Sequence, residues 1–174
     1  KRVYLRKDAM VYLKKAIKEI HARGGYFVSA GGCSGIQRPS RTLHADQHRL
    51  GTAFDLSLGC AGDRRGWVKT GGSPKGPPRY IHVRIGPHSR RHKVMCRVDD
   101  DHPAASQTPV GKHLHQIVKW GRSATTVEVV GRYFDLTELF ARHGFTSIGG
   151  YRSFYYRNGR DQGGFAPGHV VPVS

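Results

Sequence analysis

A chain of 174 residues has the usual size of one domain and can bury a hydrophobic core. Its 37% hydrophobic content, with 23 glycines and 9 prolines, argues against a helical bundle and favours a loop-rich α+β protein. The formal net charge of +17 favours polyanionic partners, and no apolar run approaches the roughly 18 residues of a membrane-spanning helix.

The first predicted element is an amphipathic helix over residues 8–23. Asp8 can cap its start, and Gly24 and Gly25 follow its end. Apolar side chains recur in it every three or four residues, which predicts one buried stripe with lysines opposite: Met10, Leu13, Ile17 and Ile20.

Two strands separated by a long polar loop are expected next. Residues 26–30 include a short apolar run typical of a buried strand, and Gly, Ser and Arg dominate the loop over 31–47. Apolar and small or polar side chains alternate over 52–58, which predicts a second strand with one face in the core.

A basic hairpin is predicted in the middle of the chain. Residues 59–78 are rich in glycine, proline and charge and are typical of a loop. Strand-like segments at 80–85 and 93–98 flank a short basic run at 88–93. We expect this hairpin to project as an edge or an insertion.

The last third of the chain is predicted to contain another hairpin, a helix and a closing strand. The hairpin strands are expected at 117–120 and 126–130. Residues 135–138 match a capping box, which predicts the start of a helix over 136–143. A final strand is expected at 168–172.

These elements predict a single α+β domain over residues 1–174. We expect segments 26–30, 52–58 and 168–172 to form one mostly antiparallel sheet, backed by the two helices. The basic hairpin would belong to an insertion over roughly 60–123.

The most informative segment of the chain contains a histidine and an aspartate seven residues apart. His48 and Asp55 flank Gly51, which lets the backbone turn without a Cβ clash. Imidazole nitrogen and carboxylate oxygen are both good ligands for Zn²⁺. Strand alternation places Asp55 on the face opposite Phe54. Without a third ligand, the same spacing also describes a strand with a solvent-facing aspartate and a nearby surface histidine.

The pattern His-x-x-Gly-x-Ala-x-Asp-Leu at residues 48–56 resembles the signature of the LAS-type zinc metallopeptidases. That family contains VanX- and VanY-like D-Ala-D-Ala peptidases, phage endolysin peptidases and the Hedgehog signalling domain. The resemblance covers about residues 1–60 and 125–174. It implies a Zn²⁺ site that includes His48 and Asp55, in a peptidase acting on D-amino-acid bonds of bacterial cell-wall peptides. The expected location is secreted or in the cell envelope.

The resemblance also implies a third ligand, a histidine near the end of the domain on a strand beside the aspartate strand. His169 matches that position in order and context, and His82 is the rival candidate. His143 is not expected to be a ligand, because a histidine in the last turn of a helix is favoured by the helix dipole without any metal.

The sequence departs from the resembled family at the catalytic carboxylate. The family places a glutamate three residues before the last histidine, where it takes a proton from the attacking water and delivers it to the leaving amine. Here that position is Ala166, which can transfer no proton. Asp161 or Glu138 could act as a substitute base, or the alignment is shifted, or activity is lost.

An arginine in the loop before the motif is the other part that the resemblance implies. It would hold the substrate carbonyl or the developing oxyanion near the zinc. Arg38 and Arg41 are both candidates. Asp46 could orient His48 as a neighbouring carboxylate.

The three cysteines, Cys33, Cys60 and Cys96, allow at most one internal disulfide. Cys33 and Cys60 flank the motif loop and could be bridged, and the cysteine spacing matches no zinc-thiolate framework. No leader is visible, although Lys1 could follow a removed one.

Three hypotheses of function remain. The first is the zinc-dependent D,D-carboxypeptidase or endopeptidase, with a peptidoglycan peptide or another wall polymer as partner. The second is a non-catalytic zinc-bound member of the same fold that binds wall polymers or a protein through its basic face. The third is a polyanion or nucleic-acid binder with an accidental motif, although no zinc finger, helix-turn-helix or RNP signature accompanies the basic residues.

Overall fold

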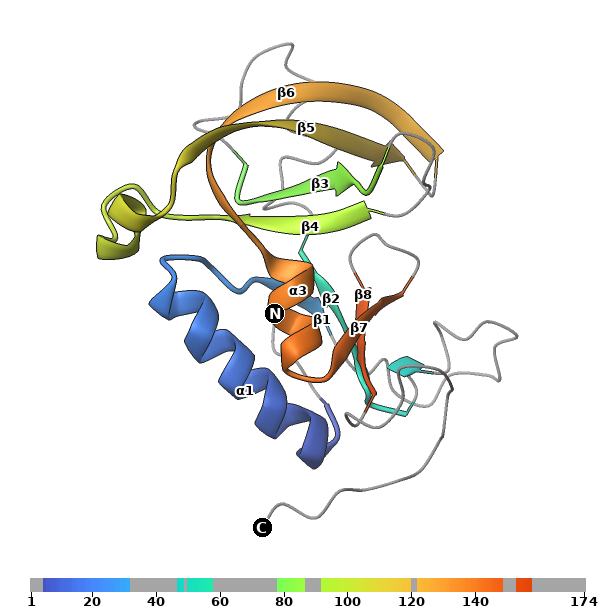
Figure 1. Ribbon diagram of the computed structural model, residues 1–174. Coiled ribbons are helices and arrows are strands. Elements are labelled where there is room, and N and C mark those ends of the chain that lie inside the picture. The colour runs from blue at the N-terminus through green and yellow to red at the C-terminus, as the bar shows by residue number, and fades with distance from the viewer. Residues whose placement is uncertain are drawn as a thin grey trace.

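The structure is a computed structural model, and the residues that it describes are 5–31, 47–48, 50–57, 78–86, 92–119, 122–148 and 153–157. The helices and strands in these ranges are α1 (Lys7–Ala22), β1 (Ser29–Gly31), β2 (Ala53–Leu56), β3 (Tyr80–Arg84), β4 (His92–Arg97), the 3-10 helix η2 (Pro103–Gln107), β5 (Val110–Lys119), β6 (Arg122–Asp135), α3 (Leu136–Arg142), β7 (Phe145–Ile148) and β8 (Ser153–Tyr156). Helices and antiparallel sheets occur together, which confirms the predicted α+β class (Figure 1).

The first sheet has the strand order β1-β2-β8-β7, and all its neighbours are antiparallel. β1 pairs with β2, so the two strands predicted around 26–30 and 52–58 do lie side by side. On its other edge β2 pairs with β8, with Phe54 opposite Phe154 and Asp55 opposite Ser153. The strand predicted at 168–172 lies outside the described residues.

The second sheet is a closed barrel with the strand order β3-β4-β6-β5. β3 and β4, the two strands of the predicted basic hairpin, pair with each other, and each also has a second neighbour in the barrel. They are therefore integral to the barrel and do not form a projecting edge. Of the basic run at 88–93, only His92 and Lys93 lie in the described residues, and both belong to β4. The barrel closes between β3 and β5 at the pair Val83 and His115.

α1 packs with one apolar face against the rest of the molecule. Ala9, Leu13, Ala16 and Ile20 are fully buried at spacings of three and four residues. The residue that caps this helix is Arg6, without a side-chain hydrogen bond, so the prediction of Asp8 as the cap is wrong. Asp8 instead lies in the first turn, where a negative charge is favoured by the helix dipole, and it pairs with Arg6 at 2.7 Å.

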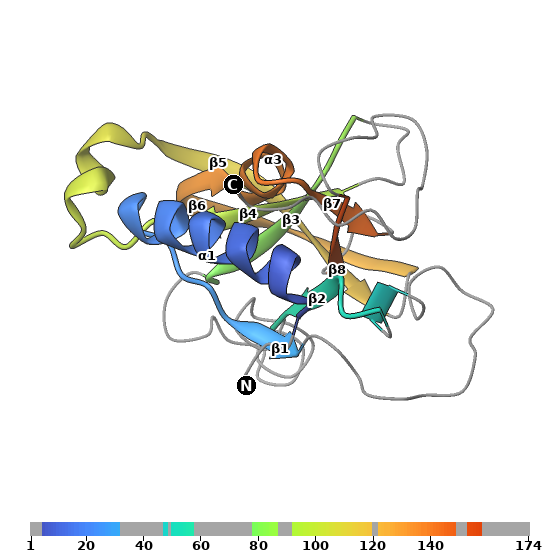
Figure 2. The ribbon, with the colours of Figure 1, turned by 90° about the horizontal axis from the view of Figure 1, so that it is seen from below.

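α3 begins where the sequence predicted it. The side chain of Asp135 accepts a hydrogen bond of 2.9 Å from the backbone N–H of Glu138, as an N-cap aspartate does. Leu136, Leu139 and Phe140 of this helix are buried. Seen from below, α1 lies in front of the barrel strands, and α3 appears above α1 in the view (Figure 2).

An aromatic cluster joins the first sheet to α3. Phe54 of β2 is fully buried, and its ring centroid lies 5.2 Å from Phe140, 5.4 Å from Phe145 and 5.7 Å from Phe154. Such pairs add to the hydrophobic burial of each ring. The strand that carries Asp55 is therefore anchored from its opposite face.

Two further sequence predictions concern membranes and cysteines. None of the described helices is long and apolar enough to cross a membrane. Cys96 is buried in β4 as a free thiol, and burial raises its pKa to about 12. Cys33 and Cys60 lie outside the described residues, so their pairing stays a prediction.

Candidate metal centre

His48 and Asp55 meet at the start of β2. His48 Nε2 lies 3.4 Å from Asp55 Oδ1, and the two side chains are 9% and 18% exposed. Two atoms bound to one tetrahedral Zn²⁺ at about 2.0–2.2 Å lie about 3.3–3.6 Å apart. The separation therefore fits a pair of ligands on one ion, and it also fits a long charge contact between imidazole and carboxylate.

The turn between the two residues depends on Gly51. This glycine has a φ of +67°, a conformation that side chains with a Cβ rarely adopt. A Cβ there would also lie 3.2 Å from the backbone nitrogen of Arg6, which donates a 2.7 Å hydrogen bond to the Gly51 carbonyl. Gly51 N–H in turn donates to the His48 carbonyl. The turn predicted at this glycine is confirmed.

Ser153 is a residue of the site that the sequence did not identify. It begins β8 directly opposite Asp55, and its Oγ donates a hydrogen bond to Asp55 Oδ1. The side chain is 3% exposed. Its place depends on the pairing of strands far apart in the chain, and the short aromatic segment that it begins carries no motif.

The order of the three side chains limits the chemistry. Ser153 and His48 both face Oδ1 of Asp55, so the carboxylate lies between the hydroxyl and the imidazole. A serine nucleophile needs the imidazole between the hydroxyl and the carboxylate, so that the ring can take the hydroxyl proton. The arrangement thus suits cation binding better than serine catalysis.

The described residues do not supply a third ligand. They contain no group of three or more His, Cys, Asp or Glu side chains placed to hold a metal ion. His82, the rival candidate, lies in β3 of the barrel, where its backbone N–H donates a 3.0 Å hydrogen bond to Nδ1 of His115. It does not join His48 and Asp55, so this alternative is wrong.

The remaining predicted site residues fall outside the described part of the chain: Arg38, Arg41, Asp46, Asp161, Ala166 and His169. Their roles stay predictions.

His143 is described, and its Nε2 lies 2.8 Å from Oε2 of Glu19, which joins α3 to α1. This contact accounts for His143 without a metal.

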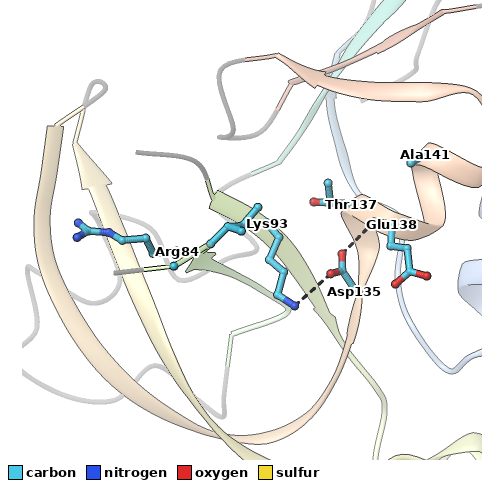
Figure 3. Close-up of a pocket in the computed structure, with 8 residues that line it drawn as sticks. Arg84, Lys93, Asp135, Thr137, Glu138 and Ala141 are labelled. Atoms are coloured by element: carbon cyan, nitrogen blue, oxygen red, sulfur yellow. Dashed lines mark hydrogen bonds and ion pairs between the residues drawn. The ribbon is translucent and has the colours of Figure 1, made fainter. Parts of the chain in front are cut away.

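Glu138, one of the two substitute bases, lines a separate pocket of about 560 Å³. In Figure 3 the side chains of Lys93 and Asp135 point toward each other, at 3.2 Å, whereas Arg84 points away from them. Thr137 accepts a hydrogen bond from the backbone of β4 at the same place. These polar groups attach α3 to the barrel.

No protein-family model, no curated protein and no solved structure matches this chain.

Proposed function

We propose that the chain is a zinc-dependent peptidase that cleaves D-amino-acid bonds in bacterial cell-wall peptides, as a D-Ala-D-Ala carboxypeptidase or an endopeptidase. The observation that carries the proposal is the 3.4 Å separation of His48 Nε2 and Asp55 Oδ1 within a motif that resembles the LAS-type signature. Its substrate would place the protein outside the cell membrane, secreted or in the envelope.

In this proposal His48 and Asp55 hold the ion, and His169 is the third ligand. Zn²⁺ when bound lowers the pKa of a coordinated water towards about 7 and polarises the scissile carbonyl. Ser153 keeps the carboxylate of Asp55 in place through its hydrogen bond. Arg38 or Arg41 would stabilise negative charge on the carbonyl oxygen as the tetrahedral intermediate forms.

None of these residues can transfer the proton to the leaving amine. Ala166 stands where the resembled peptidases have a glutamate, and loss of a general base costs on the order of 10²–10⁴-fold in rate. Asp161, which lies outside the described residues, is the proposed substitute, because Glu138 lines a separate pocket.

A non-catalytic zinc-bound member of the same fold is the second candidate. One observation favours it: Ala166 stands at the position of the glutamate. Such a protein would keep the ion to hold the motif loop and would bind a wall polymer or a protein partner.

Zinc analysis and a hydrolysis assay on the same preparation separate the candidates. The purified chain is analysed for bound zinc and incubated with a pentapeptide ending in D-Ala-D-Ala and with cross-linked wall peptides. Bound zinc with release of D-alanine or cleaved cross-links supports the peptidase. Bound zinc without turnover supports the non-catalytic member, and a chain that takes up no zinc contradicts both.

A further inference from the structure

The exposed surface of α1 is almost entirely basic. This helix is described in full, and apart from Ala22 its exposed side chains are Lys7, Lys14, Lys15, Lys18 and His21. We call this set the basic face of α1. At about 100° per residue, Lys7, Lys14 and Lys18 lie within about 40° of one another around the helix axis. All three are exposed, so they follow one line along the outer side of α1.

The acidic side chains of α1 do not offset this charge at the surface. Asp8 is 8% exposed and is paired with Arg6. Glu19 contacts Arg142 at 2.8 Å and His143 at 2.8 Å, and also Arg23 at 2.9 Å. Each carboxylate is therefore neutralised by basic groups around it, and neither offsets the charge of the lysines on the basic face.

The basic face lacks the features of a membrane-inserting helix. The large apolar side chains exposed in the described part of the chain lie on other elements: Leu50, Ile85, Val110, Leu114 and Val130. An amphipathic helix that enters a lipid interface needs apolar residues on the face that it inserts. The basic face is thus suited to an anionic partner that stays in water.

It also lacks the features of a base-reading surface. Tyr12 is half-buried, and its ring stacks on Tyr156 with centroids 5.1 Å apart, so it is not open to a nucleotide base. Lysine ammonium groups act as point charges toward phosphate and lack the planar fork of the arginine guanidinium. The chemistry of the surface favours a regular phosphate backbone without bases.

We propose that the basic face of α1 is a docking surface for a linear polyol-phosphate polymer of the bacterial wall, of the poly(glycerol phosphate) type. A line of lysines is complementary to a line of phosphodiesters, and the net charge of +17 steers the chain to such a polymer. Only the choice of a wall polymer over other phosphate polymers rests on the proposed function. Docking would hold the enzyme beside the peptides of the same wall.

The test measures binding of the whole chain to purified poly(glycerol phosphate) at several salt concentrations. Lys14→Gln with Lys18→Gln removes two charges from the basic face. The matched control, Arg84→Gln with Lys112→Gln, removes two charges from exposed positions on the barrel strands. The first variant should weaken binding about tenfold and flatten the plot of log affinity against log salt by about one to two units. The control should weaken binding less than twofold.

Equal losses in both variants would mean that net charge alone drives binding, which overturns a docking surface on α1. The chain could instead bind single-stranded DNA more tightly than poly(glycerol phosphate) and lose this binding in the Lys14/Lys18 variant. That result would identify a nucleic-acid surface. Binding of polyglutamate with the same affinity as poly(glycerol phosphate) would exclude recognition of phosphate. Bound zinc is measured in the same samples and should be unchanged by either variant. A chain without zinc that still binds the polymer through α1 would contradict the proposed peptidase and leave the docking surface intact.

Discussion

Ser153 Oγ donates a hydrogen bond to Oδ1 of Asp55 from a position 98 residues further along the chain. The same oxygen faces His48 Nε2 at 3.4 Å. A carboxylate oxygen has two lone-pair directions, so Oδ1 can accept a hydrogen bond from the hydroxyl and still face the imidazole. The hydroxyl thereby limits rotation of the Asp55 carboxylate, which a metal site requires of its ligands.

Ser153→Ala should therefore lower the affinity of the chain for zinc by about 10–100-fold, the usual effect of losing a partner that orients a ligand. The measurement is a competition titration with a chromogenic chelator. Ser147→Ala, which removes a hydroxyl from the neighbouring strand β7, is the control and should leave the affinity unchanged. Equal zinc affinities for wild type and Ser153→Ala would show that the hydroxyl does not support the site.

Ala166→Glu should raise the rate of D-Ala-D-Ala hydrolysis by up to about 10²–10⁴-fold if Ala166 stands at the general-base position. The physical reason is that a carboxylate there could carry the proton from the attacking water to the leaving amine. The assay follows release of D-alanine from a pentapeptide. Fast wild-type hydrolysis that Asp161→Asn abolishes, and that Glu138→Gln in the separate pocket does not, would identify Asp161 as a substitute base. Fast hydrolysis that neither substitution affects would mean that the C-terminal motif is placed wrongly.

Stability should fall on mild acidification because of the barrel histidine His115. Burial lowers the pKa of His115 below its ordinary value, so the unfolded chain binds this proton more readily than the folded chain. The free energy of unfolding should then decrease as the pH drops below the unfolded-state pKa of about 6.5. Protonation would also remove the acceptor of the hydrogen bond from the His82 backbone that helps close the barrel.

Urea unfolding at a series of pH values between about 7 and 5 checks this dependence. His115→Gln keeps an acceptor but does not titrate, so its stability should fall less steeply over this range. The remaining slope should include His113, whose pKa burial also lowers. Asp8→Asn is the control. The Arg6 hydrogen bond lowers the pKa of Asp8, so that carboxylate loses its stabilising effect only at lower pH, below about 4. If the free energy of unfolding of His115→Gln falls with pH as steeply as that of the wild type, His115 does not cause the dependence.

Phe54→Ala should lower the free energy of unfolding by about 3–5 kcal/mol, because it removes a fully buried ring from the aromatic cluster behind Asp55. Phe54→Leu retains most of the apolar volume and should cost less. Chemical denaturation followed by tryptophan fluorescence gives both values. Zinc affinity should fall with Phe54→Ala as well, since β2 would lose the packing that fixes it.

Local patterns in the sequence predicted local structure well. Alternation over 52–58 placed Phe54 in the core and Asp55 on the other face, and Gly51 has the positive φ that its turn requires. The aspartate before α3 caps that helix as expected. Each of these features is decided by interactions within a few residues.

Pairing between distant strands could not be predicted in the same way. The barrel depends on the pairing of β4 with β6 and on the pairing of β3 with β5, in which Val83 lies opposite His115. Ser153 meets Asp55 through the pairing of β2 with β8. No short pattern encodes which strand edges meet, because that is set by the packing of the whole molecule. The sequence therefore predicted the pair His48 and Asp55, which lie together, and missed Ser153 beside them.

Zinc binding by His48 and Asp55 can be measured by a competition titration of wild type, His48→Ala and Asp55→Asn. His143→Ala is the control, because its ring is held by Glu19. We expect one tightly bound zinc per wild-type and His143→Ala chain, and an affinity at least about 100-fold lower in the two ligand variants. Zinc that binds His48→Ala or Asp55→Asn as tightly as it binds the wild type would contradict this expectation.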